Sequence, residues 1–312
     1  MRTTTDISKF IKEAASKLGF DACGFCKAQS IGDEQKDFAA SWLTNGYNAD
    51  MAYMANNFDK RCDPTILVEG ARSIVCLALN YFPAEFQREN VPQFAYYAYG
   101  KDYHDIVKQK LQTLFDTIKE VVPSLEGRVF CDTAPVLERY WASQAGIGFI
   151  GKNSLLIIPR KGSFFFLGEL IINIELDYDQ PLTNHCGNCT RCIDACPTKA
   201  IVSPKVINSN RCISYQTIEN KGEIDSAIIP QLSNRLYGCD ICQKVCPYNH
   251  YARPQSTEAV NPSSDFLSLD AEAVANMEVE TYQRIFKGSA IKRAKLSGLK
   301  RNVGALKLSQ GQ

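Results

Sequence analysis

The segment from residue 186 to residue 197 reads Cys186-Gly-Asn-Cys189-Thr-Arg-Cys192-Ile-Asp-Ala-Cys196-Pro197. Two residues separate each of the first three cysteines from the next, so their thiolates can bind three corners of one iron–sulfur cubane. The fourth cysteine follows after three residues, and in proteins that hold two cubanes it binds the other one. The spacing therefore predicts a small, loop-rich module that is organised by metal rather than by a large hydrophobic core.

A second and incomplete copy of this pattern reads Cys239-Asp-Ile-Cys242-Gln-Lys-Val-Cys246 and is followed by proline. Leu236 stands where its first cysteine would be, and Cys212 upstream is the natural substitute. We therefore predict two [4Fe–4S] clusters in a bacterial-ferredoxin arrangement. The expected ligands are Cys186, Cys189, Cys192 and Cys246 for cluster 1, and Cys196, Cys212, Cys239 and Cys242 for cluster 2.

Other uses of these cysteines fit the sequence less well. Zinc favours two C-x2-C pairs separated by a longer loop, and disulfides need an oxidising compartment for which the sequence shows no export signal. Five cysteines lie outside the module, and no further ligands accompany the C-x2-C pair among them. We interpret these five as free, buried side chains: Cys23, Cys26, Cys62, Cys76 and Cys131.

Composition bounds the class of protein. The 312 residues are 45% hydrophobic and 22% charged, which is typical of a soluble globular protein. The formal net charge of +1 provides no global field for nucleic-acid binding, and no apolar run is long enough to span a membrane. We therefore expect a cytoplasmic protein that does not associate with membranes.

Hydrophobic periodicity divides the chain into three parts. The first part alternates between the two regular structures, which indicates an α+β domain with a central sheet. Its helices are expected near 5–18, 33–45, 102–120 and 134–145, and its strands near 20–26, 73–81, 128–131, 153–158 and 164–175. The three expected parts are a catalytic domain (1–180), the cysteine module (181–255) and a helical, basic tail (256–312).

Two further patterns allow more than one interpretation. Gly146-Ile-Gly148-Phe-Ile-Gly151 has the letters of a dinucleotide loop, but a helix precedes it and a strand follows, which is the reverse of the required order. We reject a nucleotide site and expect a tight connection there. Asp132 follows a strand and precedes Pro135, so it can cap a helix or act as a general acid beside a cofactor; the pattern alone favours the cap.

The tail is also ambiguous. Residues 287–312 contain seven lysines and arginines and no acidic residue. Such a segment is either a solvated helix face or a surface that contacts the phosphates of a nucleic acid.

Eight stretches besides the cysteine motifs resemble one known family. They are Met51-Ala-Tyr-Met54, Lys60-Arg61-Cys62-Asp63-Pro64, Gly70-Ala71-Arg72-Ser73, Tyr97-Ala-Tyr-Gly100-Lys-Asp-Tyr-His104, Asp132-Thr-Ala-Pro135-Val-Leu-Glu-Arg139, Gly148-Phe-Ile-Gly151-Lys-Asn153-Ser154-Leu155-Leu156, Gly162-Ser-Phe-Phe-Phe-Leu-Gly168-Glu169 and Lys300-Arg301-Asn302. Together they resemble the epoxyqueuosine reductases, which complete queuosine in tRNA.

The resemblance implies a function and a set of cofactors. A nitroreductase-like domain would bind cobalamin, in the cob(II)alamin form at rest, and the module would hold two [4Fe–4S] clusters. The substrate would be tRNA carrying epoxyqueuosine at the wobble position, reduced with electrons from a ferredoxin- or flavodoxin-type donor. Asp132 would be the proton donor, which reverses the preference for a cap and requires a pKa raised by burial against the corrin. We expect a monomer.

The resemblance also implies binding residues. The expected cobalamin contacts are Arg61, Tyr97, Asp132, Asn153, Ser154, Leu156, Phe166, Leu167, Ser214, Gln216 and Asp240. The expected tRNA contacts are Lys292, Arg293, Lys300 and Arg301. The chain departs from the family at Tyr99 and Lys101, where arginines are common, and we expect only the basic tail where many members carry a helical-repeat domain.

Two other functions stay open on the residues alone. One is a ferredoxin-like electron carrier, against which the large α/β region before the clusters argues. The other is a reductive dehalogenase-like enzyme, which also pairs cobalamin with two clusters but usually carries an export signal.

Overall fold

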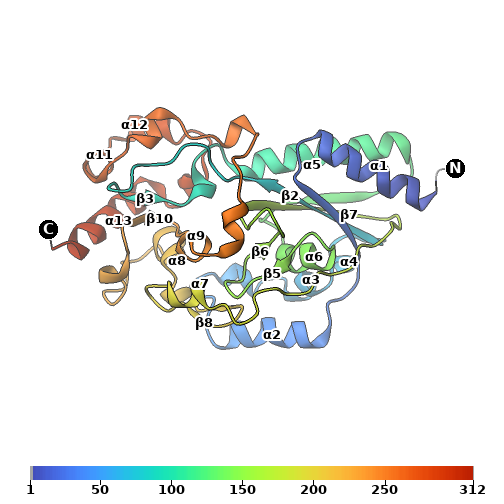
Figure 1. The fold of residues 1–312 in the computed structure, drawn as a ribbon, viewed down its shortest axis with the longest axis horizontal. Helices are drawn as coiled ribbons and strands as arrows, with labels where there is room; N and C mark the ends of the chain where they lie inside the picture. Colours follow the sequence, from blue (N-terminus) through green and yellow to red (C-terminus); the bar gives the residue numbers. More distant parts are fainter. Residues whose placement is uncertain (1–2, 312) are drawn as a thin grey trace.

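The computed structural model describes residues 3–311. Figure 1 shows a sheet with its helices at the N-terminal end, the C-terminal helices at the other end, and the cysteine module below and between them. Among the described residues, no helix is both long and apolar enough to cross a membrane.

A four-stranded antiparallel sheet organises the N-terminal half, with the order β1-β2-β7-β4. Its two central strands are buried almost throughout and are rich in β-branched and aromatic residues, as expected for strands covered on both faces. The strands are β1 (Ala22–Lys27), β2 (Ser73–Asn80), β4 (Gly127–Phe130) and β7 (Phe165–Ile172).

Side-chain alternation gives each face of this sheet its own helices. Val75, Leu77 and their neighbours on one face pack against α1 (Thr4–Lys17) and α5 (Tyr103–Val121). Ile74 and Cys76 on the other face pack against α6 (Glu138–Gln144). The smaller elements of this half are α2 (Asp33–Thr44), η1 (Ala52–Met54), α3 (Phe58–Cys62), α4 (Pro64–Leu67), and the paired strands β5 (Phe149–Ile150) and β6 (Leu156–Ile157).

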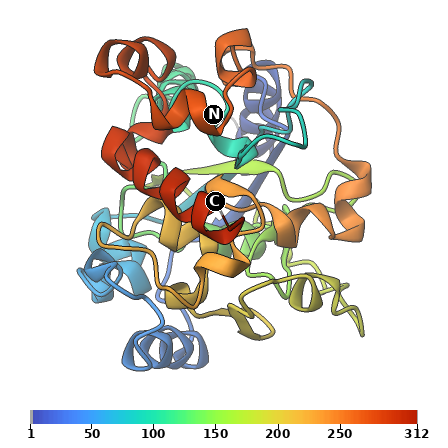
Figure 2. The same cartoon turned by 90° about the vertical axis from the view of Figure 1, so that its left-hand side faces the viewer.

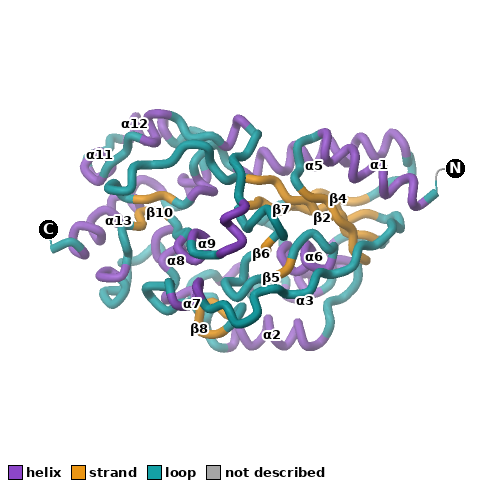
Figure 3. The backbone as a smooth tube through the Cα atoms, in the orientation of Figure 1, coloured by secondary structure: helices purple, strands orange, loops and turns teal. Residues whose placement is uncertain are grey.

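The cysteine module is built from short elements joined by loops, as Figure 3 shows. The helices α7 and α9 each lie within one copy of the cysteine motif. The elements are α7 (Arg191–Asp194), β8 (Ile201–Ser203), β9 (Val206–Ile207), η3 (Ser209–Arg211), α8 (Ile213–Ile218), η4 (Ile229–Gln231), β10 (Arg235–Tyr237), α9 (Ile241–Lys244) and η5 (Pro247–Tyr251).

The C-terminal helices share one hydrophobic core with a segment from the first hundred residues. The strand β3 (Gln93–Phe94) pairs in parallel with β10, and Phe94 packs against Phe266 and Phe286. This core therefore joins all three parts that the sequence distinguishes. Its elements also include η2 (Tyr96–Ala98), η6 (Glu258–Val260), α10 (Ser264–Leu267), α11 (Ala271–Ala275), α12 (Val279–Ile285), η7 (Ala290–Arg293) and α13 (Lys295–Ser309), which Figure 2 views from the C-terminal end.

Most of the elements predicted for the first part are present, with changed ends. The helix expected over 134–145 begins only at Glu138, and the strand expected over 153–158 is reduced to β6. The connection at Gly146–Gly151 runs from α6 into β5, which confirms the helix-to-strand order that excluded a dinucleotide loop. A side chain at Gly148 would come within 2.6 Å of the Ile157 carbonyl oxygen, which explains the glycine there.

Candidate functional site

The four cysteines predicted for cluster 1 line one cavity of about 370 Å³. Cys192 lies on α7, and Cys246 directly precedes η5. Lys152 donates to the carbonyl oxygens of Gly187 (2.7 Å) and Cys189 (2.9 Å), which fixes the loop that carries the first two cysteines. The chain therefore brings four thiols from two distant motifs around one space of suitable size.

Most of the thiols that raise the pKa of Cys246 and of Cys242 belong to the same set as the thiol they act on, and Cys192 of the first set also acts on Cys242. Burial raises the pKa of Cys246, and the nearby thiols of Cys186 and Cys189 add to this effect. Burial also raises the pKa of Cys242 well above its ordinary value, with further contributions from Cys239 and Cys212. A thiol in such surroundings needs a metal ion to stabilise its thiolate, so both sets fit an iron–sulfur cluster.

The remaining member of the second set, Cys196, lies close to Cys212. Its sulfur accepts a hydrogen bond from the backbone N–H of Ala200 at 3.2 Å. Within residues 3–311, no three Cys, His, Asp or Glu side chains converge on a point that could hold a single metal ion. Zinc would require sulfurs at about 2.3 Å from one such point.

The second part of the site is the loop that follows β4. Asp132 has a φ of +56°, and its side chain is 54% exposed, so the carboxylate faces open space at the end of the sheet. The helix α6 begins six residues later, after Leu137, and no side chain caps it. The interpretation of Asp132 as a helix cap is therefore wrong, because the chain turns through a loop between Asp132 and Glu138.

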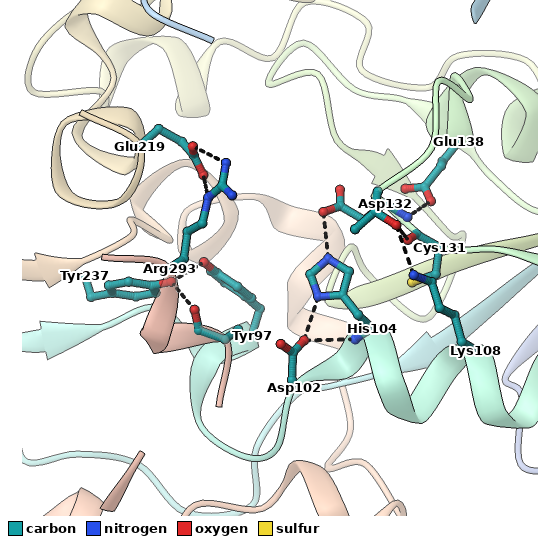
Figure 4. Close-up of polar contacts among 12 residues, drawn as sticks. Tyr97, Asp102, His104, Lys108, Cys131, Asp132, Glu138, Glu219, Tyr237 and Arg293 are labelled. Carbon is teal, nitrogen blue, oxygen red and sulfur yellow. Dashed lines mark hydrogen bonds and ion pairs between the residues drawn. The ribbon is translucent and has the colours of Figure 1, made fainter. Parts of the chain in front are cut away.

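Asp132 belongs to a row of hydrogen-bonded side chains, drawn in Figure 4. His104 contacts Asp132 Oδ2 through Nε2 at 2.9 Å and Asp102 Oδ1 through Nδ1 at 2.6 Å. Asp102 caps α5 by accepting the His104 N–H, so the start of that helix fixes the imidazole. Three residues from two segments thus form an Asp–His–Asp row that ends at the exposed carboxylate.

This row determines where protons reside. Partial burial disfavours the imidazolium, but the hydrogen bonds to Asp102 and Asp132 outweigh it and raise the pKa of His104 to about 9. The same hydrogen bond lowers the pKa of Asp132, against the smaller effect of burial. The protein groups alone therefore keep the proton on His104 at neutral pH, and the rise in the pKa of Asp132 that burial against a corrin would cause stays a prediction.

Two glutamates lie behind the loop. The backbone N–H of Asp132 donates to Glu138 Oε1, and burial raises the pKa of Glu138 to about 7. Glu169 on β7 is fully buried, and neither of its carboxyl oxygens makes a hydrogen bond of ordinary geometry. Burial, with Glu138 as the next cause, raises the pKa of Glu169 well above its usual range, so its carboxyl group is neutral.

The residues predicted to contact cobalamin come from several elements. Asn153 is buried, and its Nδ2 donates to the carbonyl oxygen of Cys242 at 3.4 Å, so it lies beside the second set of cysteines. Asp240 is also buried there and accepts the Tyr96 N–H at 2.8 Å. Ser214 and Gln216 lie on α8, which begins directly after Cys212.

The other members of this group lie nearer the sheet. Phe166 stacks on Tyr103, next to His104, with ring centroids 4.4 Å apart. Leu156 and Leu167 are buried in the core between the sheet and α6. Three more lie at the edges of the site: the Tyr97 hydroxyl contacts that of Tyr237 (3.3 Å), Ser154 donates to the Lys205 carbonyl (2.6 Å), and Arg61 donates to the Tyr53 carbonyl (3.1 Å).

The residues predicted to contact tRNA divide into two kinds. Lys292 and Lys300 are exposed. Arg293 forms a two-point ion pair with Glu219 at 2.7 and 2.9 Å, on the side of the site opposite Asp132 (Figure 4). Arg301 donates to the backbone carbonyls of Gln216 (2.9 Å) and Asn220 (2.7 Å), so it also fixes α13 to the cysteine module.

Sequence reasoning missed the partners of Asp132. A signal for one was present, because Asp102 stands two residues before His104, the spacing of an aspartate that caps a helix. Nothing local pointed to Glu138 or Glu169, which reach the loop only through the packing of α6 and β7.

An exposed carboxylate hydrogen-bonded to an imidazole, in one chain with two sets of four cysteines, is typical of an iron–sulfur oxidoreductase. Two family models match the chain: "4Fe-4S double cluster binding domain" over residues 185–249 and "Epoxyqueuosine reductase QueG, DUF1730" over residues 61–133. The epoxyqueuosine reductase of Cellulophaga algicola is 45% identical over 98% of this chain and 100% of its own length. That of Cyclobacterium marinum is 47% identical over 98% of this chain and 99% of its own.

Solved structures agree with these relatives. An epoxyqueuosine reductase bound to an epoxyqueuosine-modified tRNA stem loop has a TM-score of 0.89 and 30% identity, over 98% of this chain and 82% of its own. The Bacillus subtilis enzyme, seen with its aspartate-bearing catalytic loop swung out of the active site, has a TM-score of 0.88 and 29% identity, over 98% of this chain and 82% of its own. The chain belongs to the epoxyqueuosine reductase family.

Proposed function

We propose that this protein reduces the epoxide of epoxyqueuosine at the wobble position of tRNA to the cyclopentene of queuosine. Its membership of the family carries this proposal, and the Asp–His–Asp row, together with two sets of four cysteines, supports it. An electron carrier would not need the row, and the family assignment replaces both that alternative and a reductive dehalogenase.

We further propose that cobalamin binds between Asp132 and the second set of cysteines. The donor set fits such a group: the Asp132 carboxylate is open, and Arg61 has a buried Nε atom with no partner among the described residues. Arg61, Asn153 and Asp240 would hold its polar edges, and Phe166 its apolar ones. When bound, cobalamin supplies two-electron reducing chemistry at cobalt. The antiparallel sheet with helices on both faces is compatible with a nitroreductase-like fold.

The protein's own groups supply protons. Conversion of an epoxide to an alkene consumes two electrons and two protons and releases the oxygen as water. Asp132 is the carboxylate that would meet the departing oxygen, and the His104 imidazolium, 2.9 Å away, would reprotonate it. Asp102 holds the imidazole in the orientation that this transfer requires.

We propose that the exposed lysines of the tail bind tRNA phosphates, with Lys292 and Lys300 as the main contacts. The ion pair of Arg293 with Glu219 and the backbone contacts of Arg301 indicate a structural contribution from both arginines. Replacing the two lysines with glutamine should reduce the salt dependence of tRNA binding by about one unit of log–log slope for each phosphate that is no longer neutralised. An unchanged slope would favour a solvated face.

Anaerobic turnover tests the proposed function. The purified protein, loaded with clusters and cobalamin, is mixed with tRNA carrying epoxyqueuosine and a chemical reductant, and the nucleosides are analysed. Queuosine should appear with the parental protein and with Glu120→Gln, which changes an exposed carboxylate on α5. Absence of queuosine from a fully loaded enzyme would contradict the proposal.

A further inference from the structure

A broad hollow opens on the outer surface of the cysteine module. Its volume is about 810 Å³, and residues of α7 and α9 and the start of η5 form its walls. Three basic side chains line it, and all three are exposed: Arg191, Lys244 and His250. The proposed reaction assigns no role to this surface.

The hollow reaches one predicted cluster ligand. Cys246 lines it and also lines the separate cavity that holds the other three cysteines of cluster 1. Arg191, Cys246 and Pro247 line both spaces, and Cys246 is the predicted cluster ligand among them. A protein docked in the hollow would approach that cluster through Cys246 and its neighbour Pro247.

The second set of cysteines does not reach the hollow: of the eight predicted ligands, only Cys246 is among its lining residues. Asn153 lines the cavity of the cluster 1 cysteines, and its buried amide donates to the carbonyl oxygen of Cys242, so it lies between the two sets. An electron that enters from the hollow therefore reaches cluster 1 first.

The charges of the side chains that line the hollow indicate what kind of partner it binds. Lys244 is held over the ring of Tyr96, with its Nζ 4.2 Å from the ring centroid, so it is a positioned cation rather than a freely moving one. The one acidic side chain that lines the hollow, Asp194, accepts a hydrogen bond from the Thr190 hydroxyl at 2.6 Å. The lining therefore has more basic than acidic groups, and it attracts an acidic surface.

We propose that this hollow is the docking site of a small acidic one-electron carrier protein, which reduces cluster 1 through Cys246. The proposal rests on the proposed function, because it names the source of the electrons. Each encounter oxidises the carrier by one electron and reduces the cluster by one, so two encounters supply one epoxide reduction.

The test follows cluster reduction directly, without tRNA or turnover. Reduced flavodoxin is mixed anaerobically with the cluster-loaded protein at low ionic strength, and the loss of visible cluster absorbance is timed. The pair Arg191→Glu and Lys244→Glu should slow this reaction at least about tenfold, as for an interface steered by charge. Reduction by photoexcited deazaflavin, which needs no docking site, should keep its parental rate.

Matched controls complete the experiment. The pair Lys9→Glu and Lys119→Glu changes the net charge equally on exposed positions of α1 and α5, and it should leave both rates unchanged. If charge reversal in the hollow leaves the flavodoxin rate at the parental value, the proposal is overturned. Should that variant lose its clusters, the neutral pair Arg191→Gln and Lys244→Gln is tested instead, and the rate of cluster reduction by flavodoxin is measured at several salt concentrations. A salt dependence equal to that of the parental protein overturns the proposal, and a weaker one supports it. A protein that passes this test but makes no queuosine would refute the proposed function alone.

Discussion

The cysteine module and the loop that carries Asp132 reach their geometry by different routes. In the module, seven of the eight predicted ligands come from two short segments whose cysteine spacing predicts which thiols meet, and Cys212 joins them from the chain between the two. In the loop, Asp132 obtains its partners from the start of α5, from α6 and from β7. A site built from local spacing can be recognised in a sequence, whereas one built from tertiary contacts shows there only as separate residues.

The two regions also differ in what completes them. Burial raises the pKa values of thiols such as Cys242 and Cys246, so they stay protonated in the protein alone. Their thiolates are stabilised only when a metal supplies positive charge. The loop is already satisfied by protein groups, because His104 is hydrogen-bonded to a carboxylate at each ring nitrogen. Changes in the module should therefore alter metal content, and changes in the loop should alter proton transfer.

The largest expected effect is on the loop. Asp132→Asn removes the carboxylate that we propose meets the leaving oxygen, so the rate of queuosine formation should fall about 10²- to 10⁴-fold. Iron content should stay at the parental level, since no cysteine is changed, and cobalamin should stay bound, since asparagine has the size of aspartate. Glu120→Gln serves as the control, and an Asp132→Asn variant that turns over at the parental rate would remove Asp132 from the mechanism.

The next largest effect is expected on iron content, where a predicted cluster ligand is compared with a cysteine outside the module. Cys242→Ser should lower the iron content of the anaerobically reconstituted protein from about eight to about four atoms per chain, because one of two cubanes loses a ligand. Cys62→Ser, which changes a buried cysteine outside the module, should keep about eight. Iron analysis that gives both variants the same value would break the assignment of ligands.

A pH-dependent effect on stability is expected from His104. Its folded pKa of about 9 lies above the unfolded value of about 6.5, so the stabilisation is complete below pH 6.5 and is lost as the pH rises through 9. Between pH 7 and pH 10 the parental protein should lose about 1–2 kcal/mol of unfolding free energy relative to His104→Gln, after allowance for partial exposure.

Denaturant unfolding at the two pH values measures this difference. Parallel losses in the parental protein and in His104→Gln would show that the imidazolium does not bind the two aspartates.

The smallest effect concerns Glu169. A buried carboxyl group whose folded pKa is raised keeps its proton, while the unfolded chain releases it above about pH 4.5, so the parental protein loses stability as the pH rises. Glu169→Gln keeps the shape without this loss, and its Tm at pH 8 should exceed the parental one by about 2–4 °C, which corresponds to about 1 kcal/mol. At pH 4.5 the two should coincide. If the difference in Tm between the variant and the parental protein is the same at pH 8 and pH 4.5, Glu169 does not have the raised pKa.

The sequence predicted the helices and central strands of the first part because their apolar periodicity is strong and local, as in α5 and β2. The prediction failed where backbone conformation or contacts between distant residues determine where an element begins or which side chains meet. Pro135 suggested the first turn of a helix, but the positive φ of Asp132 and the loop after it delay α6 to Glu138. The cluster cysteines and Asp132 could be proposed as site residues, whereas the buried Glu169 has no local signature.

The pairing of Gln93–Phe94 with the strand before Cys239 has a consequence for how the molecule unfolds. Because Asp102 and His104 follow the same segment within a few residues, the imidazole of His104 and the predicted cluster ligands are attached to one shared apolar core. Removal of iron should therefore shift the Tm of a single melting transition of the whole chain to a lower temperature. A detached ferredoxin-like piece would leave Phe94 and its neighbours exposed to water, and it should aggregate rather than fold.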